Sequence, residues 1–115
     1  MQRRFRLTRK SDIKRVRQEG RSLANAMLVL GYLPNQMNQN RAAVIAGRSV
    51  GGAVQRNYAK RRIRSVFQTL QPELNQGFDL VLIARKPMLD VEHRSVINGM
   101  RSLLQRAGIM KEKVN

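Results

Sequence analysis

The spacing of apolar and polar positions along the chain predicts three helices and three strands. Helices are expected where apolar side chains recur every three or four residues, and strands where short apolar runs are bounded by turn-forming residues. The predicted order is a helix at residues 11–20, strands at 25–34 and 41–50, a helix at 53–70, a strand at 78–85, and a last helix between Asp90 and Gly108. This order favours an α+β domain in which helices pack on a small sheet.

Turn-forming residues mark the limits of the first elements. Ser11 or Asp12 can cap the first helix, and Gly20 ends it. The loop at 34–40, PNQMNQN, is rich in turn formers and separates the first two predicted strands. We therefore expect these two strands to form an antiparallel hairpin.

The last strand and the last helix carry clear core patterns. The run FDLVLIAR at 78–85 is almost wholly apolar, which is typical of a central strand covered on both faces. Asp90 can cap the final helix, and Gly108 can end it. The apolar face of this helix is expected to consist of Val96, Ile97, Met100, Leu103 and Leu104.

The helix at 53–70, AVQRNYAKRRIRSVFQTL, combines an apolar face with an unneutralised basic flank. At 100° per residue, the apolar face consists of Ala59, Ile63, Val66, Phe67 and Leu70. The adjacent flank, named here the basic strip, consists of Arg56, Asn57, Lys60, Arg61 and Arg64. Arg62 lies toward the other margin of the apolar face. The helix contains no acidic residue that could pair with these cations, so the strip is interpreted as a surface for a polyanion, with an ordinary solvated face as the alternative.

Composition favours a nucleic-acid-binding domain. The chain has 115 residues, of which 42% are hydrophobic, so it can form one domain with a modest core. It carries 23 Lys and Arg against 7 Asp and Glu, for a formal net charge of +16. Such a charge repels itself unless a polyanion compensates it, and arginine, the commoner cation here, binds phosphate through two hydrogen bonds. A solvated basic surface and a membrane-surface protein are weaker alternatives, since no bulky apolar stripe faces the lysines.

Other classes of function find little support in the sequence. The segment MQRRFRLTRKSD has no apolar core of a signal peptide, the longest apolar stretch is too short to span a bilayer, and cysteine is absent. We therefore expect a cytoplasmic protein that engages no membrane. One histidine, His93, and dispersed carboxylates form no triad, P-loop or metal-ligand spacing, so neither an autonomous nuclease nor a small-molecule substrate is expected. DNA binding is disfavoured because no helix-turn-helix pair is evident.

The stretch SVGGAVQRNYAKRRIRSVF resembles the signature helix of the bacterial ribonuclease P protein component. The family pattern is a G-x-A-V turn followed by R-N-R-x-K-R-x-x-R. Gly51, Ala53 and Val54 match the turn, and Arg56, Asn57, Lys60, Arg61 and Arg64 match the helix. The stretches LTRKSDIKRVRQEGRS, DLVLIARKP and SLLQRAGIM are similar to the family's opening helix, last strand and final helix. The resemblance therefore covers almost the whole chain, although Tyr58 replaces the second arginine of the R-N-R core.

The resemblance implies a particular version of the α+β fold. In this family a small mixed sheet carries three helices in the order α-β-β-β-α-β-α, resembling the second domain of ribosomal protein S5. A short additional strand is then expected near residues 22–24, after the first helix. The whole chain, 1–115, would form a single RNA-binding domain, with residues 1–10 and 110–115 flexible.

The resemblance also implies a function and its partners. In the family, the RNA subunit performs the Mg²⁺-dependent hydrolysis that removes the 5′ leader of pre-tRNA, and the protein binds both RNAs. The basic strip is thus expected to dock on the ribonuclease P RNA. The cleft between the first helix and the sheet is expected to hold the leader, through Ile13, Arg17, Tyr32 and Arg48. Ile13 and Arg17 stand where the family usually has phenylalanine. A structural or ribosomal-type RNA-binding protein with no role in cleavage is the alternative.

Overall fold

A computed structural model of the chain describes residues 5–112, and residues 1–4 and 113–115 lie outside this range. The described elements are α1 (Lys10–Glu19), β1 (Arg21–Ala24), β2 (Leu28–Pro34), β3 (Arg41–Ile45), α2 (Ala53–Leu70), the 3₁₀ turn η2 (Gln71–Glu73), β4 (Phe78–Ala84), the 3₁₀ turn η3 (Lys86–Leu89) and α3 (His93–Arg106). The predicted α+β class and the order α-β-β-β-α-β-α are confirmed. The short strand expected near residues 22–24 is β1.

The strands form one mixed sheet in the order β1-β2-β4-β3. β2 is antiparallel to β1 and to β4, whereas β3 is parallel to β4. The predicted central position of β4 is confirmed, since β4 lies between β2 and β3 in the sheet. Most of its apolar side chains are buried, as expected for a strand whose two faces are both covered. The predicted hairpin between β2 and β3 is wrong, since β4 lies between them. The hairpin partner of β2 is β1, whose mostly exposed side chains suit an edge strand.

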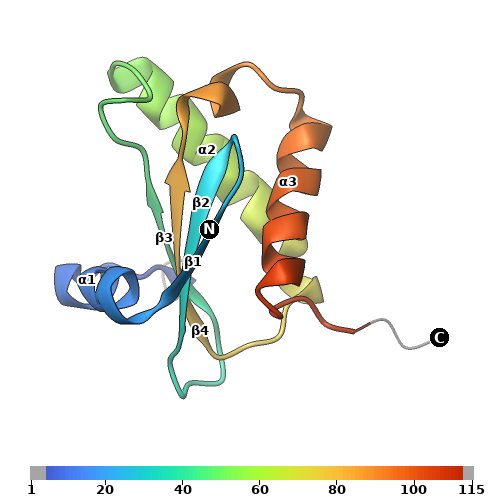
Figure 1. Cartoon of the computed structure of the whole chain (residues 1–115). Coiled ribbons are helices and arrows are strands. Elements are labelled where there is room, and N and C mark those ends of the chain that lie inside the picture. Colours follow the sequence, from blue (N-terminus) through green and yellow to red (C-terminus); the bar gives the residue numbers. More distant parts are fainter. Residues whose placement is uncertain (1–4, 113–115) are drawn as a thin grey trace.

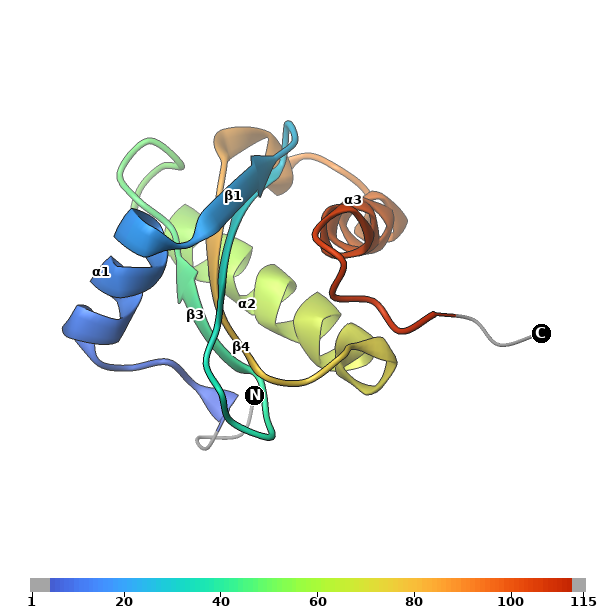
Figure 2. The ribbon, with the colours of Figure 1, turned by 60° about the horizontal axis from the view of Figure 1, so that its bottom comes forward.

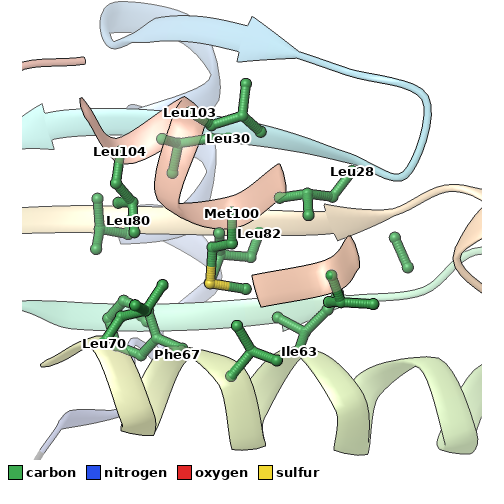
Figure 3. Packing of buried hydrophobic residues seen from close by; sticks show 14 of the residues in the cluster. Leu28, Leu30, Ile63, Phe67, Leu70, Leu80, Leu82, Met100, Leu103 and Leu104 are labelled. Carbon is green, nitrogen blue, oxygen red and sulfur yellow. The ribbon is translucent and has the colours of Figure 1, made fainter. Parts of the chain in front are cut away.

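Helices cover both faces of the sheet: α2 and α3 lie on one side and α1 on the other (Figures 1 and 2). The larger core lies between the sheet and the pair α2 and α3, and Figure 3 shows its leucines meeting from all of these elements. The predicted apolar faces of α2 and α3 are confirmed, with only Ile97 partly exposed. A smaller core beneath α1 consists of Leu7, Val16, Ala43 and Val81.

The predicted side-chain caps of two helices are wrong. α1 begins at Lys10 with Arg9 as its N-cap and no capping side chain. Asp12 lies inside the first turn, where its carboxylate accepts from Arg15 at 3.1 Å instead. α3 begins after Glu92, because Asp90 is held at the end of η3, where its N–H donates to the carbonyl of Pro87. The predicted helix ends are confirmed at Gly20 and at Gly108, which adopts φ +77°.

Both terminal segments contact the fold where the structure describes them. The N–H of Leu7 donates to the carbonyl of Ala42 at 2.8 Å, and the Leu7 side chain is buried. The N–H of Lys111 donates to the carbonyl of Glu73 at 2.8 Å. The expectation that residues 1–10 and 110–115 are flexible stays a prediction. Its parts at residues 1–4 and 113–115 lie outside the described residues.

Gly20 allows α1 to end directly against β2. A Cβ atom here would lie 2.5 Å from the carbonyl oxygens of both Tyr32 and Val16, and backbone atoms cannot rotate aside. We expect Gly20→Ala to lower the free energy of unfolding by about 2 kcal/mol, measured by urea denaturation. At Gly47 a Cβ would meet nothing within 4 Å, so Gly47→Ala is the matched control, expected to change stability by less than about 0.5 kcal/mol. Equal effects of the two changes would refute the steric explanation.

Candidate nucleic-acid interface

The basic strip forms one flank of α2. Arg56, Lys60 and Arg64 follow one another at single-turn intervals, along about 12 Å of helix, and are partly buried. Asn57 and Arg61 lie further around the helix and are exposed. The apolar face of α2 is packed on the larger core, which fixes the direction in which the strip points. The structure therefore brings together all five residues predicted for this surface.

The side chains of the strip lack partners within residues 5–112. None of its four cations forms a side-chain hydrogen bond or an ion pair with another described residue. The Nε atoms of Arg56 and Arg64 are buried and unpaired in this part of the chain. A buried N–H without an acceptor costs about 1–3 kcal/mol, so these groups gain most from an incoming oxygen acceptor. Phosphate oxygens supply both the acceptor and the compensating charge.

Arg62, on the opposite flank of α2, has a different role. It is only 9% exposed, and its Nη1 and Nη2 donate to the carbonyls of Met88 at 2.6 Å and Val91 at 2.8 Å. These bonds tie α2 to the segment around η3. The helical projection puts Arg62 at the margin of the apolar face, and its burial is a feature that was not predicted. Its position next to Ala59 and Val66 on the helical projection is the signal that was available.

A hollow of about 220 Å³ lies beside α1 on the sheet face opposite to α2. The residues lining this α1 hollow are Val16, Arg17, Gly20, Arg21, Ser22, Val29, Gly31, Val81 and Ile83. The strands supply an apolar floor, and Arg17 of α1 lines one side. An apolar floor beside a cation suits an extended strand of nucleic acid, whose bases can lie on the floor and whose phosphates can meet the cation.

Of the four residues predicted for the cleft, Arg17 lines the α1 hollow and the others do not. Ile13 packs partly against the smaller core and borders an adjoining depression, which shares Arg17 with the α1 hollow and is otherwise lined by Lys10, Lys14 and Gln18. Tyr32 lies on the other sheet face and packs against the larger core. Arg48 is exposed in the turn after β3.

The alternation of side chains along β2 explains why Tyr32 does not line the α1 hollow. Successive side chains of β2 point to opposite faces, so Tyr32 shares the face of Leu28 and Leu30, whereas Val29 and Gly31 face α1. This parity was available in the sequence and assigns Tyr32 to the core. Ser22, which pairs with Gly31 on the α1 face, was missed because β1 has no apolar pattern of its own. Arg21 pairs with Tyr32, so its side chain shares the face of Tyr32.

A network of four charged residues holds α1 against the sheet. Asp79, only 1% exposed, accepts from Nε of Arg41 at 2.9 Å and from Nη2 at 2.8 Å. Arg15 of α1 lies 3.7 Å from Asp79 and bonds Asp12, which is 3.8 Å from Arg41. The hydrogen bonds that Arg41 donates to Asp79 raise the pKa of Arg41 above its ordinary value, although burial opposes the rise. Arg41 therefore stays charged, and the wall of the α1 hollow is fixed in place.

In residues 5–112, no three His, Asp or Glu side chains gather as a metal-binding group. No helix in this range has the length and apolar character needed to cross a membrane.

The family model and the relatives found by sequence comparison all point to one family. The family model described as Ribonuclease P matches residues 1–108. The chain is 36% identical to the ribonuclease P protein component of Chloroflexus aurantiacus, over 100% of this chain and 86% of that protein. It is also 36% identical to the protein of the same name from Roseiflexus castenholzii, over 100% of this chain and 95% of that protein.

Comparisons of structure agree with those of sequence. The RNase P protein of Staphylococcus aureus superposes with a TM-score of 0.83 at 27% identity, covering 93% of this chain and 98% of that chain. The RNase P protein of Thermotoga maritima superposes with a TM-score of 0.80 at 31% identity, covering 88% of this chain and 96% of that chain.

Proposed function

The chain belongs to the ribonuclease P protein family, and from this premise we propose that it binds the catalytic RNA and the 5′ leader of pre-tRNA. Membership of the family implies tRNA processing together with an RNA subunit. In the proposal, the ribonucleoprotein removes the leader by endonucleolytic cleavage in the cytoplasm and releases the mature tRNA 5′ end. The basic strip contacts the catalytic RNA, and the α1 hollow contacts the leader.

The observation that carries the proposal is the unpartnered basic strip. Arg56, Lys60 and Arg64 present a row of donors for which residues 5–112 offer no acceptor, and two of the Nε atoms are buried. A folded RNA presents phosphate oxygens at close intervals and gains affinity by releasing its counterions when cations bind. The apolar face of α2 supplies rigidity, so the row is positioned before the RNA arrives.

The leader is the part of the substrate that fits the α1 hollow. It is single-stranded, so its bases are free to lie on the apolar floor formed by Val29, Gly31 and Ile83. Arg17 of α1 lines the same hollow and can meet its phosphates. Because α1 and α2 cover opposite faces of the sheet, both RNAs can be bound at once (Figure 2).

The hydrolytic chemistry is assigned to the RNA subunit. Mg²⁺ bound by that RNA would supply the metal chemistry at the scissile phosphodiester. The side chains of this protein bind and orient the two RNAs. The cations of the basic strip also neutralise phosphate charge, so less Mg²⁺ is needed to bring the two RNAs together.

Leader binding is tested by Arg17→Ala. We expect this change to weaken binding of leader-bearing pre-tRNA to the assembled ribonucleoprotein about tenfold, the value of one charge-assisted hydrogen bond, while mature tRNA binding stays within twofold. Lys14→Ala is the matched control, because it removes one charge from the same helix outside the α1 hollow. Equal losses for pre-tRNA and mature tRNA in the Arg17→Ala variant would rule out this hollow as the leader site.

A further inference from the structure

A second hollow, of about 630 Å³, lies between the first turns of α2 and η3. The residues lining this Tyr58 hollow are Val50, Gly51, Val54, Gln55, Tyr58, Arg61, Lys86, Leu89 and Asp90. It shares no residue with the α1 hollow, and α2 lies on the opposite sheet face from α1. It is therefore a separate surface feature from the hollow that we assign to the leader.

Two large apolar side chains of α2 are exposed to solvent at the Tyr58 hollow. Val54 is 77% exposed and Tyr58 is 40% exposed, and the two residues are one helical turn apart. Met37 is the other large apolar side chain exposed within residues 5–112, and it lies in a loop. Paired exposure on a rigid helix, next to a concave surface, is typical of a contact site.

The ring of Tyr58 is held in position from one side. The guanidinium carbon of Arg62 lies 5.5 Å from the ring centroid, and Arg62 is itself fixed by its bonds to the carbonyls of Met88 and Val91. The cation lies over the ring, and the Tyr58 residue is still 40% exposed. A ring that is already fixed loses little conformational entropy when a flat ligand stacks on it.

The charges around the Tyr58 hollow favour a nucleotide. Arg61 and Lys86 are exposed cations without an ion pair to any other described residue, and they can take a phosphate. Asp90 is an acceptor that can receive a hydrogen bond from a ribose hydroxyl or a base amino group. A bare phosphate would use the two cations only, whereas a nucleotide uses the ring, the cations and the carboxylate.

We propose that the Tyr58 hollow binds an unpaired nucleotide of the catalytic RNA, with its base stacked on Tyr58 and its phosphate at Arg61 and Lys86. The catalytic RNA is the occupant because Arg61 belongs both to the basic strip and to this hollow, so the two surfaces are continuous. The inference rests on the proposed function of the strip. It extends the RNA-binding surface around α2 to the flank of Tyr58.

Stacking predicts a distinctive dependence on salt. Tyr58→Ala is expected to weaken binding of the cognate catalytic RNA about tenfold, equally at every salt concentration, because stacking releases no counterions. Tyr58→Phe keeps the ring and should bind within twofold of the natural protein. Thermal unfolding of each variant checks that the fold is intact. Unchanged affinity of Tyr58→Ala, or a loss that disappears at high salt, would overturn the proposal.

A direct spectroscopic test uses the absence of tryptophan from the chain. Tyr58→Trp places a single indole at the hollow, and we expect saturation with the catalytic RNA to quench its fluorescence. Quenching by pre-tRNA alone, a change caused by self-association without RNA, or no change at saturation would each refute the assignment. Failure of RNA binding by the proposed function is distinguishable, because the natural protein would then not bind the catalytic RNA at all.

Discussion

Replacing Lys60 and Arg64 together by alanine is expected to weaken binding of the cognate catalytic RNA about a hundredfold at low salt. Each side chain is assigned one phosphate contact, and a hydrogen bond between charged groups contributes about 1.5 kcal/mol at the lower end of its range. Two such contacts give about 3 kcal/mol, or a hundredfold in the dissociation constant. The apolar face of α2 is untouched, so the fold should persist.

The salt dependence separates docking from a general effect of charge. Loss of two phosphate contacts should lower the slope of log affinity against log salt by about 1.5. Arg94→Ala plus Arg106→Ala is the matched control, since it removes two exposed arginines from α3 on a surface assigned no RNA contact. Filter binding over a range of salt concentrations measures both variants. Equal losses and equal slopes for the two pairs would show that the basic strip has no special role.

Replacing Asp79 by alanine is expected to lower the free energy of unfolding by about 3 kcal/mol, which is a large share of the stability of a small domain. The carboxylate is buried and accepts from Arg41 twice and from the side-chain amide of Asn35 at 2.9 Å. Its removal leaves these donors unpaired and a part-buried guanidinium uncompensated. It also removes the sheet anchor for Arg15 of α1.

The matched control for Asp79 is an exposed ion pair in the same molecule. Glu73 accepts from Arg101 at 3.3 Å, but both side chains are nearly half exposed, and such pairs contribute less than about 1 kcal/mol. Urea denaturation should therefore show a large loss for Asp79→Ala and a small one for Glu73→Ala. If Asp79→Ala were no more destabilising than Glu73→Ala, the charge network would not be the element that holds α1.

The parts predicted correctly from sequence are those determined by local pattern. The apolar face of α2 follows from a 3.6-residue period, and the basic strip follows from the same projection. The central position of β4 follows from its unbroken apolar run. Gly20 and Gly108 marked helix ends because glycine interrupts the pattern in a recognisable way. These features depend on neighbours within a few residues.

The parts predicted wrongly depend on pairings between distant segments. The insertion of β4 between β2 and β3 pairs residues that are 38 to 56 positions apart, and no local signal competes with the expectation of a hairpin. The burial of Arg62 depends on carbonyls supplied by the η3 region. The cap expected at Asp12 is absent because its carboxylate contacts Arg15 and Arg41. The cap expected at Asp90 is absent because Asp90 ends the η3 turn. Tyr32 is an exception, since strand parity alone would have placed it correctly.

The central claim is that this chain assists leader removal by its RNA partner. The most direct test compares pre-tRNA cleavage by the cognate RNA at low Mg²⁺, with and without the chain, alongside the chain alone. The account predicts strong stimulation by the chain and no cleavage by the chain alone. Tight binding of the RNA without any stimulation would contradict it and would indicate a structural RNA-binding protein, whereas cleavage by the chain alone would indicate an autonomous nuclease.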